Sequence, residues 1–80
     1  MRKFKDKEIK KYVISDLSIP TNYIMSKRNG NYCLIDNIVA ATKFISKNVA
    51  NNICEECKQN TGIDLVVIPI NIIYEIIEEE

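Results

Sequence analysis

The segment "IDLVVIPINIIYEII" (residues 63–77) decides the fold of this 80-residue chain. Isoleucine and valine dominate it, and both residue types favour strands over helices. Pro69 lacks a backbone N–H, so we expect it at a sheet edge or at a bend between two strand pieces. A helix is the alternative for 70–77, because several apolar residues there also repeat every 3.6 positions: Ile70, Ile73, Tyr74 and Ile77. We predict a strand.

The segment "SKNVANNICEECKQNTG" (46–62) predicts the main helix, over about 46–61. Ser46 is a typical N-cap, and Gly62 stands where a left-handed residue ends a helix. Five small or apolar side chains fall within about 140° of arc, the width of a core-facing stripe. They are Val49, Ala50, Ile53, Cys54 and Cys57.

The segment "NYIMSKRNGNYCLID" (22–36) predicts a β-hairpin. Two short apolar runs flank Asn29-Gly30, the pair that most readily forms a type I′ turn. Residues 10–17 favour a first strand. Residues 36–44 begin with Asp36, a good helix cap, and predict one or two helical turns that cover the end of the sheet.

Together these elements predict a two-layer α+β fold in which one main helix packs on one face of a mainly antiparallel sheet of about four strands. Its length makes residues 1–80 a single small domain, with 1–9 as a frayed basic arm in the alternative interpretation.

The net charge is zero, which gives no overall attraction to nucleic acid or to a membrane surface. The charge is uneven, however, because residues 2–11 carry six cations and the last six residues carry four glutamates. Such ends act as interaction tails, or they attract each other as neighbouring strand ends. No stretch approaches the roughly 18 apolar residues of a membrane span, and no secretory signal is recognisable. We expect a cytoplasmic protein.

Cys54 and Cys57 form a C-x-x-C, which is typical of zinc sites and redox pairs. Zinc prefers four nitrogen or sulfur ligands, yet the chain has no histidine and only Cys33 as a third thiol. A redox cysteine normally lies at a helix N-terminus, whereas Cys54 lies eight residues beyond Ser46. We therefore interpret both cysteines as core residues and expect no metal and no cofactor. A structural zinc module built on Cys54, Cys57 and Cys33 stays as an alternative.

Catalysis is not expected, because acid–base chemistry near neutral pH usually uses histidine. The two glycines, Gly30 and Gly62, are too few for a glycine-rich phosphate loop. The serines have no base beside them in the sequence. We predict a protein that is not an enzyme.

Two surfaces are candidates for binding. The hairpin tip combines Lys27, Arg28 and Asn29 with Tyr23 and Tyr32 on its strands. Such a tip could stack bases and hold phosphate, or it could be a solvated turn.

The last segment is apolar on both of its faces, and one helix covers only one face of a sheet. This surplus favours a protein partner or a second copy of the chain, unless residues 36–44 and the N-terminus cover it. The candidate contact residues there are Ile72, Tyr74 and Ile76.

The pattern of "KYVI", "YIMSKRNGNYCLID", "AATKFISKNVANNI" and "LVVIPI" resembles small proteins encoded by phages and prophages of low-GC Gram-positive bacteria. The resemblance spans about residues 11–70 and involves core and cap positions. Some phage proteins of this size, anti-CRISPRs among them, inhibit host defence by binding a protein target. The resemblance therefore implies a non-enzymatic inhibitor that docks on a host protein, with a small nucleic-acid-binding protein as the alternative.

Overall fold

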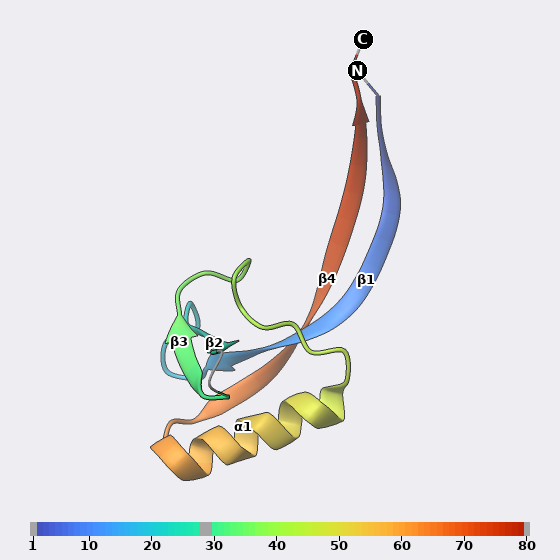
Figure 1. Cartoon of the computed structure of the whole chain (residues 1–80). Coiled ribbons are helices and arrows are strands. Elements are labelled where there is room, and N and C mark those ends of the chain that lie inside the picture. Colours follow the sequence, from blue (N-terminus) through green and yellow to red (C-terminus); the bar gives the residue numbers. More distant parts are fainter. Residues whose placement is uncertain (1, 28–29, 80) are drawn as a thin grey trace.

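A computed structural model describes residues 2–27 and 30–79 of the chain. It contains the strands β1 (Arg2–Asp16), β2 (Tyr23–Ser26), β3 (Tyr32–Ile35) and β4 (Leu65–Glu78), and the helix α1 (Lys47–Thr61). The strands form one sheet in the order β3-β2-β1-β4, and each pair of neighbours is antiparallel. The predicted two-layer α+β class, with α1 against the sheet, is confirmed (Figure 1).

Two of the four strands are much longer than the others. β1 and β4 pair along almost their whole length, from Asp16 with Leu65 to Arg2 with Glu78. They leave the body of the protein as a twisted two-stranded ribbon (Figure 1), which we define as residues 2–11 and 70–78. The principal extents of the molecule are accordingly 53 × 26 × 23 Å.

The segment 63–77 is a strand from Leu65 onward, as predicted, and Pro69 lies on the outermost strand of the sheet. The first strand is longer than expected, because residues 2–9 belong to β1 rather than to a frayed arm. The basic and acidic ends of the chain are neighbouring strand ends, and Arg2 is 3.1 Å from the carboxylate of Glu78.

The core lies between α1 and the sheet. Ile14 and Ile24 from the strands meet Ala50 and Cys57 from α1, and all four side chains are buried. Val49 is 50% exposed, so its predicted place in the core is wrong. It lies at one margin of the apolar stripe, whereas Ala50 and Cys57 lie near its middle.

Both ends of α1 are capped as predicted. The hydroxyl of Ser46 accepts a hydrogen bond from the Val49 N–H, at 3.5 Å. Gly62 has φ +73°, and its N–H donates to the Lys58 carbonyl at 2.7 Å. Capping depends only on neighbouring residues, which makes it readable from the sequence.

Residues 36–44 are not the short helix that Asp36 predicted. The Asn37 side chain, not Asp36, accepts the Val39 N–H at 2.9 Å, and the segment makes a single turn. The chain then runs along β1, where Tyr12 and Phe44 exchange two backbone hydrogen bonds of 2.9 and 2.8 Å. One helical bond is present, from the Ala41 N–H to the Asn37 carbonyl at 3.1 Å. Beyond it, backbone bonds to Ile24 of β2 and to Tyr12 of β1 replace the helical bonds that this sequence favoured locally.

The hairpin of β2 and β3 is confirmed, with Ser26 paired to Tyr32. The type I′ turn predicted on Asn29-Gly30 falls partly outside the described residues. The Gly30 N–H donates to Lys27 and the Lys27 N–H donates to Asn31, so the chain reverses between Lys27 and Asn31. Gly30 has the positive φ (+82°) that the sequence predicted, and Asn29 lies outside the described residues.

Among the described residues, no helix is long and apolar enough to cross a membrane.

Candidate protein-binding surface

One side of the ribbon is largely apolar: its β4 residues from Ile70 to Ile76 are apolar, and Lys7 and Lys11 of β1 share that side with Phe4 and Ile9. Side chains alternate between the two faces of a strand, and the cross-strand pairs therefore fix which residues share a face. Ile72 pairs with Ile9, and Ile76 pairs with Phe4. We define the ribbon face as Phe4, Ile9, Ile70, Ile72, Tyr74 and Ile76.

The ribbon face is open to solvent at its outer part. Tyr74 is 55% exposed, and Phe4 and Ile76 are each 40% exposed. The helix cannot cover them, because α1 packs against the opposite face, where Ile14 and Val67 lie. A group of exposed large apolar side chains indicates an interaction site more often than a single exposed apolar side chain does.

A bulge in β1 creates this surface. The register shifts between Lys5 and Lys7, so that Asp6 is an extra residue opposite β4. Phe4 and Ile9 are five positions apart and would point to opposite faces of a regular strand. The bulge brings both to the ribbon face. A strict alternation of faces along the sequence would place Phe4 and Ile9 on opposite faces. For that reason neither residue was predicted as part of a site.

A cleft adjoins the ribbon face where the 36–44 segment passes over it. Its volume is about 680 Å³, and most of its lining is apolar: Ile38, Val39, Lys43, Ile70, Asn71, Ile72 and Tyr74. Val39 is 82% exposed at the rim. The predicted coverage of the sheet by this segment is therefore only partial, although Ala41 is buried.

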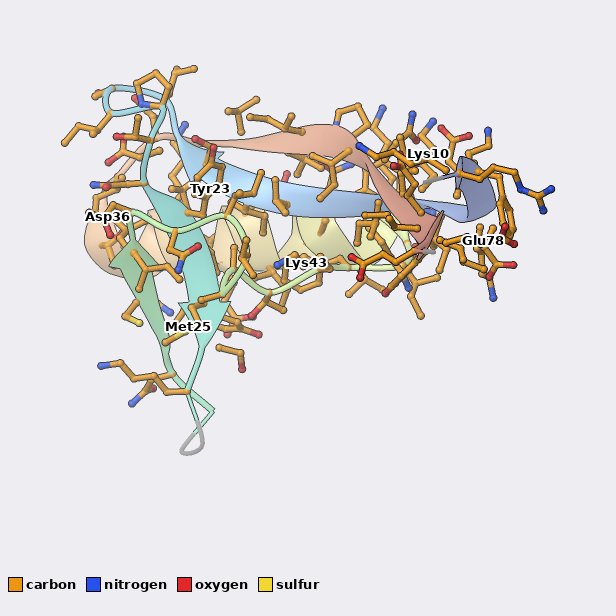
Figure 2. The ribbon with its side chains drawn as sticks, turned by 90° about the horizontal axis from the view of Figure 1, so that it is seen from above. Lys10, Tyr23, Met25, Asp36, Lys43 and Glu78 are labelled. Atoms are coloured by element: carbon orange, nitrogen blue, oxygen red, sulfur yellow. The ribbon has the colours of Figure 1, made fainter. Side chains whose placement is uncertain are left out.

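Lys43 fixes one wall of the cleft. Its ammonium donates to the carbonyl of Ile38 at 2.6 Å and also to that of Val39. The cation (labelled in Figure 2) thus closes the turn and brings a positive charge to the edge of a mostly apolar hollow. None of the sequence patterns indicated Lys43, because its role depends on a turn that the sequence predicted as helix.

The opposite face of the ribbon is more polar. It carries Lys3, Lys5, Glu8 and Lys10, with Ile73 and Ile77 as its exposed apolar residues. Lys5 and Glu8 form an exposed ion pair of 3.0 Å. The ribbon face also holds Lys7 and Lys11, but the opposite face adds Asn71 and Glu75 of β4 to its charged β1 residues. The ribbon face is therefore the more apolar of the two.

The hairpin candidates are not brought together. Tyr23 lies opposite Ser15, on the side of the sheet away from α1, whereas Tyr32 packs against the core on the α1 side. Lys27 is exposed, and Arg28 and Asn29 lie outside the described residues. The two tyrosines thus do not form the shared stacking platform that a base-binding tip needs.

The three cysteines are free thiols, and Cys57 is buried in the core. Burial raises the pKa of the Cys57 thiol above its ordinary value, and the neighbouring Glu56 raises it further. Burial and Glu55 likewise raise the pKa of Cys54. Raised pKa values keep both thiols protonated and poorly nucleophilic at neutral pH.

The zinc alternative has no ligand set in the described part of the chain. Cys33 lies on the face of β3 opposite to Leu34 and donates to the Met25 carbonyl at 3.7 Å. Leu34 packs towards α1, so Cys33 points away from Cys54 and Cys57. Within residues 2–27 and 30–79, no three Cys, Asp or Glu side chains are close enough to hold a metal ion.

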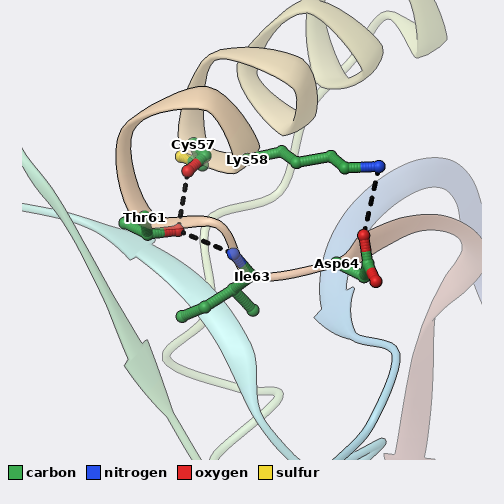
Figure 3. Close-up of polar contacts among 5 residues, drawn as sticks. All are labelled: Cys57, Lys58, Thr61, Ile63 and Asp64. Atoms are coloured by element: carbon green, nitrogen blue, oxygen red, sulfur yellow. Dashed lines mark hydrogen bonds and ion pairs between the residues drawn. The ribbon is translucent and has the colours of Figure 1, made fainter.

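The polar groups at the carboxyl end of α1 form structural hydrogen bonds and an ion pair. The Thr61 hydroxyl donates to the Cys57 carbonyl at 2.7 Å and accepts the Ile63 N–H at 3.3 Å (Figure 3). Lys58 and Asp64 form an exposed ion pair of 3.1 Å. These contacts connect the helix to β4 and engage the polar groups beside Cys57 in structural bonds.

Comparison with protein-family models, with curated proteins and with solved structures finds no match to this chain.

Proposed function

We propose that this protein is a non-enzymatic binding module that docks the ribbon face and the adjoining cleft on a protein partner. The observation that carries the proposal is the apolar ribbon face, with Tyr74 at 55% exposure beside a hollow of about 680 Å³. Aromatic and aliphatic side chains in such a position are typical of the energetic centre of a protein interface.

The chemistry of the cleft agrees with binding rather than catalysis. Lys43 and Tyr74 are the titratable side chains among its lining residues, and two carbonyl oxygens already accept hydrogen bonds from the Lys43 ammonium. The whole chain lacks histidine. Neither feature supports proton transfer to a substrate, which needs a group that titrates near the working pH.

We further propose that the partner is a host protein and that the module is a phage-encoded inhibitor acting in the bacterial cytoplasm. The support for this is the resemblance of residues 11–70 to small phage and prophage proteins. A ribbon that projects from a small body is suited to this role, because it can enter a groove of a larger protein without exposing the core.

The test is affinity capture from lysates of low-GC Gram-positive bacteria with two matched variants. Ile76→Asn changes the ribbon face, whereas Ile77→Asn changes the opposite face at a neighbouring and similarly exposed residue. We expect a captured protein that is identified by mass spectrometry, is lost with Ile76→Asn and is retained with Ile77→Asn. Equal capture by both variants would contradict docking through the ribbon face.

A further inference from the structure

We propose that β4 also pairs with β4 of a second copy of the chain, antiparallel, about a two-fold axis beside Tyr74. This pairing uses the backbone edge of β4, whereas the proposed function uses the side chains of the ribbon face. The inference therefore goes beyond the proposed function and does not depend on it.

The outer edge of β4 is available for such pairing. Within residues 2–27 and 30–79, β4 is the last strand in the order β3-β2-β1-β4 and pairs with β1 on one side only. An edge strand presents N–H and C=O groups that another strand can bond. A two-stranded ribbon is also marginally stable by itself, and further strands stabilise it.

The structure identifies which backbone groups face outward. Tyr12 directs its N–H and C=O to Phe44, away from β4, so its partner Pro69 also directs its backbone away from β1. Because bonding alternates along a strand, every second residue beyond Pro69 also faces outward. These residues are Asn71, Ile73, Glu75 and Ile77.

Two-fold symmetry and this alternation allow few registers for the pairing of one β4 with the β4 of a second copy. An axis at Tyr74 places Ile73 opposite Glu75 of the second copy and Asn71 opposite Ile77. All four residues have both an N–H and a C=O, so every outward group between residues 71 and 77 finds a partner. Tyr74 then lies opposite Tyr74 at a non-hydrogen-bonded position, where side chains approach most closely.

The neighbouring registers are poorer. An axis at Ile72 or Ile73 places Pro69 opposite Glu75 or Ile77, and each such pair loses one hydrogen bond. An axis at Glu75 places two glutamates opposite each other, which is destabilising. The register on Tyr74 avoids both faults.

Charge complementarity supports the same register. Glu78 of the second copy lies opposite Ile70, on the side of the sheet that carries the ribbon face. Ile70 pairs with Lys11 in β1 and lines the cleft together with Lys43. The acidic strand end of each copy therefore comes to the side of the sheet on which Lys11 and Lys43 of the other copy lie, one strand away from Lys11.

Cysteine cross-linking tests the register. In a background with the native cysteines changed to alanine (Cys33→Ala, Cys54→Ala and Cys57→Ala), Tyr74→Cys brings two Cα atoms to about 4.5 Å across the axis. That separation suits a disulfide. Ile72→Cys and Ile76→Cys each place identical residues about 13 Å apart, but in a double variant they face each other across the axis.

We expect oxidation to cross-link Tyr74→Cys and the Ile72→Cys/Ile76→Cys double variant into dimers, and to leave each single variant at 72 or 76 monomeric. Cross-linking of a single variant at 72 or 76 in preference to Tyr74→Cys would overturn the register.

Sedimentation of the unmodified protein provides a test that does not depend on the folding of the cysteine variants. We expect a mass twice the 9.2 kDa of the chain. Ile73→Pro removes an outward N–H and should return the mass to that of a monomer, with the circular dichroism of the fold retained. A monomer at the highest concentration that the protein reaches would overturn the dimer. Capture of a partner through the ribbon face is measured separately with Ile76→Asn and Ile77→Asn, so failure of one proposal is distinguishable from failure of the other.

Discussion

The hydroxyl of Thr61 donates to the carbonyl of Cys57 one turn earlier and accepts the N–H of Ile63, which lies beyond the end of the helix (Figure 3). A single side chain thus joins the last turn of α1 to the chain that enters β4. Thr61→Val keeps the branched shape and removes both hydrogen bonds. We expect a loss of about 1 kcal/mol in the free energy of unfolding, measured by urea denaturation. Thr61→Ser is the matched control and should retain most of the stability; an equal loss in both variants would contradict the assignment.

Substitution of Gly62, at the same end of α1, should also lower the free energy of unfolding, but for a different reason. Its φ of +73° is strained for residues with a side chain, and a Cβ built there has no heavy atom within 4 Å. Gly62→Ala should therefore lower the free energy of unfolding by about 1–2 kcal/mol through backbone strain alone. Gly62→Asn should lose less, because asparagine tolerates the left-handed region better. Thermal unfolding of both variants checks the order, and a stable Gly62→Ala would contradict it.

Cys57 is predicted to act as a core residue. Cys57→Ser places a hydroxyl among the apolar side chains between α1 and the sheet, next to Ile14 and Ile24. We expect the free energy of unfolding to fall by about 1–3 kcal/mol, measured by chemical denaturation. Cys33→Ser should lose less, because that side chain is half-buried and bonds a carbonyl. Stoichiometric zinc in the purified protein that disappears with Cys57→Ser would instead support the zinc module.

The thiols also predict a dependence of stability on pH. The unfolded chain releases these protons near the ordinary thiol pKa of 9.0, whereas burial raises the pKa of Cys54 and Cys57 in the folded state. Above pH 9.0 the folded state therefore holds more protons than the unfolded state, and stability falls as the pH rises through the raised values. Urea denaturation at about pH 8 and about pH 10 should show this fall. The fall should be smaller in Cys54→Ala/Cys57→Ala; an identical fall would assign it to other groups.

The outward direction of Pro69 predicts that a backbone donor can be added at this position without a loss of folding stability. Its nitrogen faces away from β1, so Pro69→Val adds an outward donor and leaves the β1–β4 ladder unchanged. We expect the same midpoint of urea denaturation and the same dimer by light scattering, because residue 69 lies outside the pairs that the Tyr74 register forms between residues 71 and 77. Ile68→Pro is the control, because its N–H faces β1 and its loss should destabilise the fold. A destabilised Pro69→Val would show that the outward direction is wrong.

Elements set by neighbouring residues were predictable from the sequence. Ser46 and Gly62 fixed the ends of α1, and the isoleucines around Pro69 indicated an edge strand. Tyr74, Ile72 and Ile76 were also identified as exposed candidates for protein contact, and the structure places all three on the ribbon face.

Elements set by distant residues were not predictable. Residues 2–9 form a lysine-rich stretch with little strand character, and it is their partner β4 that makes them a strand. The bulge at Asp6 and the bonding of Phe44 to Tyr12 are likewise long-range. Phe4, Ile9 and Lys43 entered the candidate surface through these contacts, so no local pattern could have found them.

The pairing of the first strand with the last strand has a consequence for the order of folding. Arg2 and Glu78 are 76 positions apart in the chain and meet at the far end of the ribbon. Closing so large a loop costs more entropy than forming the hairpin or α1, which need only local contacts. The β1–β4 hydrogen bonds should therefore form first at Asp16 and Leu65, where the helix and hairpin already hold the strands together. Pairing should then extend outward, one residue pair after another, to Arg2 and Glu78. The ribbon face, formed last and opened first, is then the most adaptable part of the protein.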